Sequence, residues 1–354
     1  MTRYAVGIAV FLTVTAAAPA QKLSDEETKE GFVSLFDGKD FSGWRFGNGS
    51  ALDKLPPNWK VEDDVIKLSG GASPHLASQW DYDDFDLRLE WRGFFKGYNS
   101  GVYVRSGRAV GDNQINLAQS DAGHLMGKFK GGNKVPELQK GLKEWNEWRV
   151  LAAGEKMTLW CNGKQAWEVT EFKVPRGYLG LQAEGQVMEF RNLRIKEIGY
   201  DSLSDPKKWA GAERWKTEDG ALVPDGAAET AKKDYKSYVL RLEWAAEKGA
   251  MGAVGLRGGK SEAAIVFGDV AEGSGAIPTA GAKPQKKLDN PLGQWNYLEV
   301  RVAGDKGRVW LNGSVVADGV DLKKVKDLPG SGAVGLKGEG GLRVRNVRIK
   351  EAKE

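Results

Sequence analysis

The chain has 354 residues, of which 41% are hydrophobic and 28% charged, a composition typical of a globular protein with about two domains. Its 52 Lys and Arg residues against 48 Asp and Glu residues leave a net charge of +4, too small for the concentrated basic surface of a nucleic-acid-binding protein. The single Cys161 excludes an intrachain disulfide and a cysteine-held metal cluster, and two histidines leave little room for a polyhistidine metal site.

The first twenty residues have the pattern of a secretory signal peptide. Arg3 precedes a short apolar run over residues 4–18, and Ala18-Pro19-Ala20 supplies the small residues of a cleavage site. The run is too short and too rich in Ala and Thr for a membrane span. We therefore expect residues 1–20 to be removed near Ala20 and the mature protein to be periplasmic or secreted. A buried N-terminal strand or helix is the alternative interpretation.

One short helix is predicted directly after this segment. Ser24 can cap its first turn, Glu27 completes a capping box three residues later, and Gly31 can end it. No amphipathic helix of crossover length appears between the strand-like segments that follow. This absence of helical periodicity disfavours a parallel α/β fold, in which such helices connect neighbouring strands.

The remaining chain shows the two-residue periodicity of β-strands. Apolar residues alternate strictly with charged ones from Phe85 to Trp91, which predicts a half-buried strand. Asn162-Gly163 and Asn312-Gly313 each lie between strand-like flanks, and this pair tolerates the positive φ angles of a tight type I′ hairpin. Short antiparallel strands with glycine-rich turns predict an all-β fold of the β-sandwich or jelly-roll type.

The sequence contains two copies of one domain. Several landmarks recur in the same order, each about 150 residues further along the chain. A period this long gives each copy enough residues for a core of its own, unlike the short units of a solenoid. We therefore predict a signal peptide at 1–20, a first β-sandwich at 21–199 and a degenerate second copy at 200–354. The repeated landmarks include Leu87–Trp91 with Leu240–Trp244, Trp145-Asn146 with Trp295-Asn296, and Arg191–Glu197 with Arg345–Glu351.

The first copy contains a recognisable opening stretch from Gly31 to Trp44, followed by Asn99-Ser100-Gly101 with Arg105. The stretch resembles the opening signature of the 3-keto-disaccharide hydrolase family, whose domains are concanavalin A-like jelly rolls, and the later residues resemble its Asn-Ser-Gly…Arg motif. The resemblance extends over residues 31–197. Further motifs follow in the family's order at Asp112–Ile115, Gly180–Gln182 and Glu189–Asn192.

The chain departs from the family pattern at two places, and its second copy departs further. The family carries Asp-His after the late Gln, where this chain has Ala183-Glu184 behind Gln182, and a family Glu is replaced by Asp112. In the second copy Asn-Ser-Gly reads Ala250-Met251-Gly252, and Lys337 stands for Gln182. The second copy thus keeps the strand pattern and loses the polar motif.

The resemblance implies cleavage of the glycosidic bond of 3-keto-glycosides. A ketone at sugar C3 acidifies the C2 proton, so that a base can form an enolate, the C1 substituent can leave, and water can add. Such an enzyme needs a base and fixed donors or a cation for the enolate oxygen. The candidate catalytic residues are Arg105, for the developing charge, Asp112, as base or metal ligand, and Glu184, as the alternative base.

Five further residues are candidates for binding the sugar. Tyr103 and Arg105 alternate on one strand, which predicts that they share a face, as do Asp112 and Gln114. Every candidate also has a plainer interpretation, such as a surface salt bridge for Arg105 or a solvated turn for Asp112. The candidate substrate-binding residues are Asn99, Tyr103, Gln114, His124 and Gln182.

The sequence leaves three functions open. The first is an exported enzyme acting on an oligosaccharide or 3-keto-glycoside, and the second is a non-catalytic, lectin-like carbohydrate-binding module. The third, a cell-surface interaction module, rests on the degenerate second copy alone. The metal requirement is unknown, because a divalent cation could serve the enolate and no cofactor follows with certainty from the residues.

Overall fold

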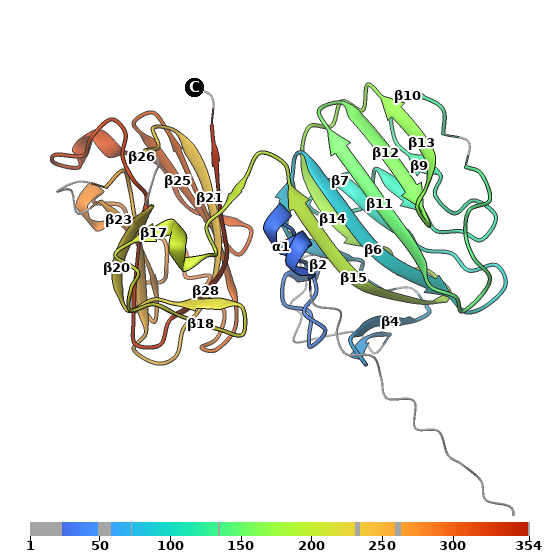
Figure 1. The fold of residues 1–354 in the computed structure, drawn as a ribbon, viewed down its shortest axis with the longest axis horizontal. Helices are drawn as coiled ribbons and strands as arrows, with labels where there is room; N and C mark the ends of the chain where they lie inside the picture. The colour runs from blue at the N-terminus through green and yellow to red at the C-terminus, as the bar shows by residue number, and fades with distance from the viewer. Residues whose placement is uncertain are drawn as a thin grey trace, which may run out of the picture.

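The computed structural model describes residues 23–48, 58–71, 73–133, 135–230, 234–258 and 263–352. The predicted signal peptide lies outside the described residues. Within these ranges the chain forms four antiparallel sheets, which pair into two β-sandwiches that stand side by side in Figure 1. The predicted all-β fold with two tandem sandwiches is confirmed. No helix in the described part of the chain is long and apolar enough to cross a membrane.

The first sandwich consists of a nine-stranded and a six-stranded sheet. The nine-stranded sheet has the order β10 (Lys130–Gly131), β13 (Lys164–Thr170), β12 (Lys156–Cys161), β11 (Asn146–Ala153), β6 (Phe85–Gly93), β15 (Val187–Glu197), β4 (Val65–Ser69) and β3 (Trp59–Glu62), with β1 (Val33–Ser34) on β15. The six-stranded sheet has the order β2 (Trp44–Phe46), β5 (Leu76–Tyr82), β14 (Gly177–Leu181), β7 (Gly101–Ser106), β8 (Gln114–Asn116) and β9 (Leu125–Met126).

The second sandwich repeats this plan with fewer strands in the described residues. Its larger sheet has the order β18 (Lys216–Glu218), β19 (Ala221–Val223), β28 (Arg343–Glu351), β21 (Tyr238–Ala245), β24 (Asn296–Ala303), β25 (Lys306–Leu311) and β26 (Ser314–Asp321), with β16 (Asp201–Ser202) on β28. The smaller sheet has the order β17 (Trp209–Ala210), β20 (Gly226–Thr230), β27 (Gly335–Glu339), β22 (Met251–Gly255) and β23 (Ala264–Gly268). Three 3₁₀ turns, Pro206–Lys208, Pro278–Ala280 and Leu322–Lys324, lie in its connections.

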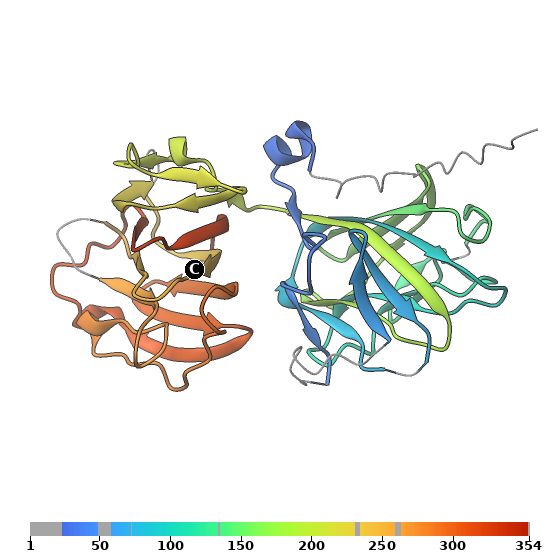
Figure 2. The same cartoon turned by 90° about the horizontal axis from the view of Figure 1, so that it is seen from below.

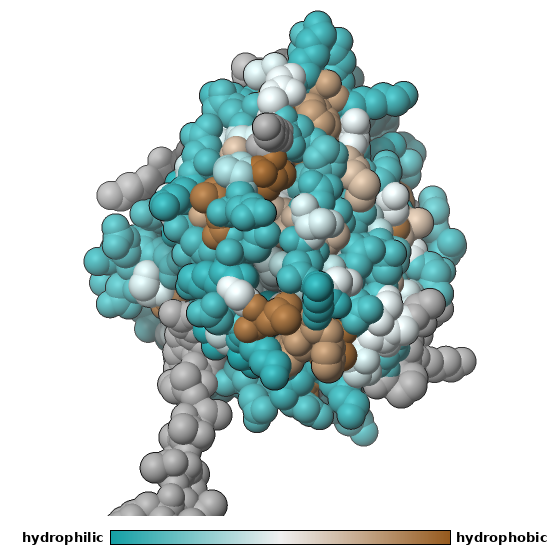
Figure 3. All heavy atoms as spheres, turned by 90° about the vertical axis from the view of Figure 1, so that its right-hand side faces the viewer, coloured by the Kyte–Doolittle hydropathy of each residue, from teal (hydrophilic) through white to brown (hydrophobic). Residues whose placement is uncertain are grey.

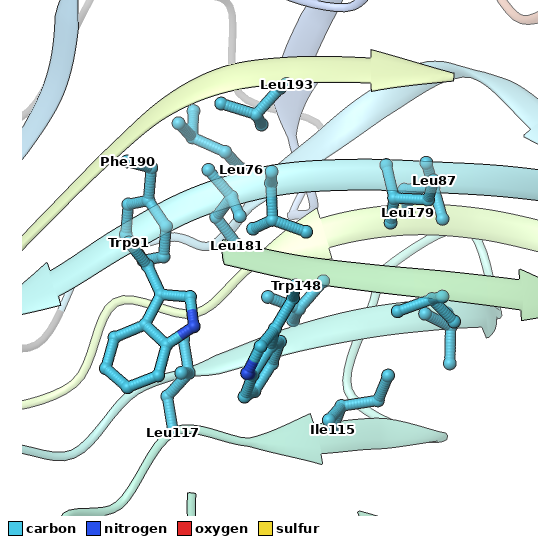
Figure 4. Packing of buried hydrophobic residues seen from close by; sticks show 14 of the residues in the cluster. Leu76, Leu87, Trp91, Ile115, Leu117, Trp148, Leu179, Leu181, Phe190 and Leu193 are labelled. Carbon is cyan, nitrogen blue, oxygen red and sulfur yellow. The ribbon is translucent and has the colours of Figure 1, made fainter. Parts of the chain in front are cut away.

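Apolar residues from both sheets meet inside the first sandwich. Leu179 and Leu181 of β14 face Trp91 of β6 and Trp148 of β11, and all four side chains are at most 2% exposed (Figure 4). The alternation that predicted a strand at 85–91 therefore places its apolar side chains in this core. Seen from the side turned away from the second sandwich, the surface is mainly hydrophilic, with small separate hydrophobic patches (Figure 3).

The predicted helix and hairpins are also confirmed. α1 (Asp25–Glu30) has Ser24 as its N-cap with the complete capping box to Glu27, and it ends at Gly31, whose φ is 89°. Asn162 and Gly163 have φ angles of 51° and 77°, and Asn312 and Gly313 have φ angles of 50° and 74°. Two successive positive φ angles are those that a type I′ turn requires.

The two sandwiches contact each other through a buried ion network. Arg241, on the outer face of β21, is fully buried and bonds to Glu299 of its own sheet at 2.7 Å. It also bonds to Glu197 and Asp81 of the first sandwich, at 2.5 and 3.1 Å. Although burial opposes its charge, the carboxylates of Glu197 and Glu299 raise the pKa of Arg241 well above its ordinary value. This network joins both sandwiches, which lie side by side in Figure 2 as well, with the connecting segment between them.

In the first sandwich, the face equivalent to the one that carries Arg241 is covered by the helix α1. Arg88 and Arg194 stand where the second sandwich has Arg241 and Arg348, since both pairs lie opposite each other on neighbouring strands. In the first sandwich these arginines reach Glu27 of α1, with Arg194 Nε donating to Glu27 Oε1 at 2.5 Å. The helix thus covers on the first sandwich the arginine pair whose equivalent on the second sandwich is covered by Glu197 of the first.

Candidate functional site

The candidate residues gather on the outer face of the six-stranded sheet. The strand register places Arg45, Ala77, Gly180, Tyr103, Gln114 and Met126 in one row across the sheet. Tyr103 pairs with both Gly180 and Gln114. A second row, two residues along each strand, holds His75, Gln182, Gly101, Asn116 and His124. Tyr103, Gln114, Gln182 and His124 therefore share one face, as residues two apart on a strand must.

Two glutamine amides form the centre of this face. Gln114 Nε2 donates to Gln182 Oε1 at 2.5 Å and lies 3.4 Å from the carbonyl oxygen of Ser100, while Ser100 Oγ donates to the carbonyl of Gln182 at 2.8 Å. The Gln114 side chain lies directly over Gly101, where an added Cβ would come within 1.6 Å of Nε2. This close approach explains why the Asn-Ser-Gly motif needs its glycine: Gly101 leaves the space in which Gln114 lies.

His75, Tyr103 and Glu184 form the ionisable part of the face. The His75 and Tyr103 rings lie 5.3 Å apart, and His75 Nδ1 accepts the backbone N–H of Ala183 at 3.1 Å. This bond places the imidazole proton on Nε2, and burial lowers the pKa of His75, so that the ring is neutral. Burial raises the pKa of Tyr103 to about 12, and the charges of Glu184 and Asp112 add to that shift.

Glu184 follows Ala183, whose backbone N–H donates to His75 Nδ1. Its charge raises the pKa of Tyr103, in addition to burial, and opposes the lowering of the His75 pKa by burial. Glu184 is half-buried, and no hydrogen bond to its carboxylate occurs among the described residues. A carboxylate near two neutral donors and not otherwise engaged is suited to taking a proton from a ligand.

Asp112 is engaged in holding the loop beside the site. Its Oδ1 accepts from Ser106 Oγ and from the backbone N–H of Gly107, the latter at 2.9 Å. The Ser106 hydrogen bond lowers the pKa of Asp112, with Gly107 contributing in the same direction. A carboxylate stabilised in its charged form is a weak base, so Asp112 is better suited to shaping the loop than to abstracting a proton.

Arg105 does not join Tyr103 on this face, and the prediction that the two share a face is wrong. Between Tyr103 and Ser106 β7 has one residue more than its partner β14, a β-bulge, and Arg105 within it has a φ of 43°. The bulge turns the side chain away from the site. The guanidinium is 1% exposed and bonds to Asp84 and to three backbone carbonyls, those of Asp83, Gly154 and Val174.

The second sandwich identifies the role of Arg105. Arg257 occupies the same place, has a φ of 55°, and bonds to the carbonyls of Lys236, Pro329 and Gly304. A residue kept in both copies with the same type of partners ties loops together at one end of each sandwich. Comparison of the two repeats would have revealed this, because Arg257 stands two residues after Gly255 as Arg105 stands two residues after Tyr103, and the register makes those two positions equivalent.

The remaining candidates lie at the borders of the site. His124 is at the edge strand, where both of its ring nitrogens lie within 3.3 Å of Asn133 Nδ2. Asn99 is half-buried just before β7. Sequence reasoning placed His75 outside the site, although it alternates with the buried Leu76. It also missed Arg45, whose guanidinium lies 4.5 Å from the Tyr178 ring centre.

The second sandwich has none of this polar cluster at the matching register positions. Gly255 pairs with Gly335 and Ala264, as Tyr103 pairs with Gly180 and Gln114. Glycine and alanine therefore stand where the first sandwich has tyrosine and glutamine. The register also shows that the counterpart of Gln182 is Lys337, the next residue but one after Gly335. The register makes Ala253 the counterpart of Gly101, so the pairing of Gly101 with Gly252 expected from the sequence is wrong by one residue. The second copy lacks the polar residues in this corrected alignment too.

The site does not offer a set of metal ligands. Among the residues that the structure describes, no three His, Cys, Asp or Glu side chains gather closely enough to hold a metal ion. The donors at the site are amides, a phenol, a neutral imidazole and a single carboxylate, which do not fit a protein-held divalent cation. A recess of about 300 Å³ lies elsewhere, in the second sandwich between residues 280–285 and 317–324.

Substituting Gly101 by alanine is expected to displace Gln114. The strand tolerates alanine here, because the second sandwich has Ala253 at the matching position, paired with Val266 and Lys337. In the first sandwich the new methyl group would meet Gln114 instead. We expect the hydrogen bond from Gln114 Nε2 to Gln182 Oε1 to break, which lowers the free energy of unfolding by about 0.5–1.5 kcal/mol. The double variant Gly101→Ala, Gln114→Ala removes the collision, so a lower stability of the single variant than of the double one is expected in thermal unfolding.

One protein-family pattern matches the chain at two successive places. The sequence pattern of the 3-keto-alpha-glucoside-1,2-lyase-like domain matches residues 31–196 and again residues 201–350. A 3-keto-disaccharide hydrolase of Bacteroides thetaiotaomicron is 25% identical over 246 residues, which cover 51% of this chain and 83% of that protein. The domain pattern therefore covers both sandwiches.

Solved structures resemble about one half of the chain each. A candidate glycosyl hydrolase of Parabacteroides distasonis matches 50% of this chain and 98% of its own, at 24% identity and a TM-score of 0.41. The carbohydrate-binding module CBM66 of Bacillus subtilis matches 44% of this chain and 96% of its own, at 14% identity and a TM-score of 0.35.

Proposed function

The chain belongs to the 3-keto-disaccharide hydrolase family, and on that premise we propose that its first sandwich cleaves the glycosidic bond of 3-keto-glycosides. One observation carries the proposal: Tyr103, Gln114 and Gln182 lie on one sheet face beside Glu184, while small residues or a lysine replace the first three in the second sandwich. A fold shared with lectins cannot by itself distinguish binding from catalysis, whereas a carboxylate beside neutral donors supports proton transfer.

The reaction begins with removal of the sugar C2 proton by Glu184. The electron pair of the C2–H bond moves to the C3 ketone and forms an enolate, whose oxygen needs hydrogen-bond donors. The phenol of Tyr103 and the Nε2–H of neutral His75 are suited to that task, because both remain protonated at neutral pH. Fixed donors that need no reorganisation lower the barrier most where water is excluded.

The bond between C1 and the leaving oxygen then breaks. The enolate electron pair forms the C1–C2 double bond and restores the ketone, and the leaving alkoxide takes a proton, which protonated Glu184 can return. Water subsequently adds its oxygen to C1 and a proton to C2. The sum of these steps is hydrolysis of the glycoside, and every electron pair and proton is accounted for without an oxidant or reductant.

The amide pair and the loop residues serve recognition in this proposal. Gln114 and Gln182 offer donors and acceptors to sugar hydroxyls, while Asn99, Asp112 and His124 border the same face. We also propose that the protein is exported, on the pattern of its first twenty residues. N-terminal sequencing of protein from the cell exterior or periplasm tests this, and a chain that still begins at Met1 would contradict it.

The proposal is tested by incubating the full chain with a 3-keto-disaccharide in deuterated water. We expect release of a 3-keto-hexose that carries deuterium at C2, since the abstracted proton is replaced from solvent. The matched control is the same disaccharide with a hydroxyl at C3, which lacks the acidifying ketone and should remain intact. Release without deuterium at C2 would overturn the mechanism, and binding of the ketosugar without any product would favour the lectin-like alternative.

A further inference from the structure

A loop of the first sandwich forms one border of the candidate site. This site loop, residues 107–112, follows β7 and ends at Asp112, whose carboxylate accepts hydrogen bonds from Ser106 and Gly107. Val110 in its middle is 5% exposed and packs in one cluster with Tyr103 and Ala77. Any movement of the loop therefore changes the surroundings of Tyr103 on the site face.

The inner side of the site loop rests directly on backbone. A Cβ added at Gly47 would come within 2.1 Å of the Ala109 carbonyl oxygen. A Cβ added at Gly180 would lie 3.0 Å from Tyr103 Cδ2 and 3.1 Å from Val110 Cγ1. Both glycines thus allow the loop and the Tyr103 ring to lie flat against the sheet.

The outer side of the same loop is held by the second sandwich. Arg108 Nη1 donates to the carbonyl oxygen of Gly313 at 2.7 Å, across 205 residues of sequence. The carbonyl of Arg108 in turn accepts from Arg45 Nη2 at 2.6 Å, and the Arg45 guanidinium lies 4.5 Å from the Tyr178 ring centre. Arg108 therefore binds Gly313 of the second sandwich through its side chain and Arg45, a member of the site row, through its carbonyl.

Both sandwiches have an Asn-Gly turn at this position, and only the turn that contains Gly313 contacts the other sandwich. The Asn312-Gly313 turn of the second sandwich touches the first, since a Cβ at Gly313 would lie 2.9 Å from Arg108 Nη1 and 3.6 Å from the Gln79 carbonyl oxygen. At the matching Gly163 an added Cβ would meet nothing within 4 Å. The φ angles of the two glycines are nearly equal, 74° and 77°.

We infer that the second sandwich is a positioning domain for the site of the first: the Gly313 carbonyl fixes Arg108 and thereby holds the site loop against Tyr103. This inference rests on the proposed function for its effect on turnover, but the ordering of the loop can be measured without any substrate. On this inference, the second copy has a role although it lacks the polar cluster. Arg108 and Gly313 act here through the loop and are positioning residues.

The test compares Gly313→Ala with Gly163→Ala in the full chain. Both variants place a side chain at the same positive φ and carry the same backbone strain, so any stability loss common to both is corrected by the control. Only Gly313→Ala pushes against Arg108. We expect amide hydrogen exchange of residues 107–112 to become about tenfold faster in Gly313→Ala and to stay unchanged in Gly163→Ala.

Activity on a 3-keto-disaccharide provides the second readout. We expect kcat/KM to fall about tenfold in Gly313→Ala relative to Gly163→Ala, because misplaced groups at a site reduce rates steeply. Arg108→Lys, which keeps a donor for the Gly313 carbonyl, should retain more activity than Arg108→Ala. Equal exchange and equal activity in the two glycine variants would overturn the inference. An inactive wild-type chain with faster loop exchange in Gly313→Ala alone would overturn the proposed function and leave the positioning contact intact.

Discussion

Replacing Glu184 by glutamine is expected to abolish turnover of a 3-keto-disaccharide. The amide has nearly the shape of the carboxylate but cannot accept the C2 proton, and a positioned general base contributes about 100- to 10,000-fold to a rate. Because Glu184 is half-buried and its carboxylate makes no hydrogen bond among the described residues, Glu184→Gln should change the free energy of unfolding by at most about 0.5 kcal/mol. Substrate binding should persist, so the loss should appear in kcat rather than in KM.

The second sandwich supplies the matched control for this variant. Glu339 stands four residues after Gly335, as Glu184 stands four residues after Gly180, and the strand register makes these glycines equivalent. Glu339 is exposed beside Lys337 and has no polar cluster around it. Glu339→Gln should therefore leave turnover at the wild-type level. Wild-type activity in Glu184→Gln would show that another group takes the proton.

Replacing Arg241 by methionine is expected to cause the largest loss of stability. Arg241 is fully buried, and its removal leaves Glu197 and Glu299, themselves 1% and 4% exposed, without their principal shared counter-charge. Breaking a buried ion network by removing one partner costs about 3–5 kcal/mol. Arg348 and Arg301 still contact these carboxylates, which favours the lower end of that range. Urea unfolding followed by tryptophan fluorescence measures the change.

Arg88 provides the control, since it occupies the equivalent strand position in the first sandwich. Its side chain is 24% exposed and lies 3.5 Å or more from its carboxylate partners, Asp86 and Glu27. Exposed pairs of this kind contribute about 0–1 kcal/mol, so Arg88→Met should be nearly neutral. If both variants lose the same amount of stability, the contact between the sandwiches does not depend on Arg241.

The local features of this fold could be predicted because short sequence patterns determine them. The alternation at residues 85–91, the capping box at Ser24 and Glu27, and the Asn-Gly turns each depend on a few neighbouring residues. These are the features for which local propensity and the final structure agree. Tyr103, Gln114 and Gln182 are candidates because of the family motifs, but their common face is given by the strand register.

The wrong or missed predictions depend on the pairing and register of strands that are far apart in the sequence. Arg105 left the site because of one extra residue in β7 relative to β14, and nothing in the sequence near Arg105 announces a bulge. His75 joined the site because β5 lies next to β14, a neighbour about 100 residues further along the chain. The contact from Gly313 to Arg108 links the two copies, and periodicity within one copy cannot reveal it.

The helix α1 covers the arginine pair on the outer face of the first sandwich. The sandwiches dock head to tail, with unlike surfaces in contact, and an arrangement of that kind can repeat indefinitely unless something stops it. Glu27 occupies the arginine pair of the first sandwich that would otherwise await an acidic neighbour. The six-residue helix thereby neutralises on the first sandwich the same pair of charges that a neighbouring sandwich neutralises on the second.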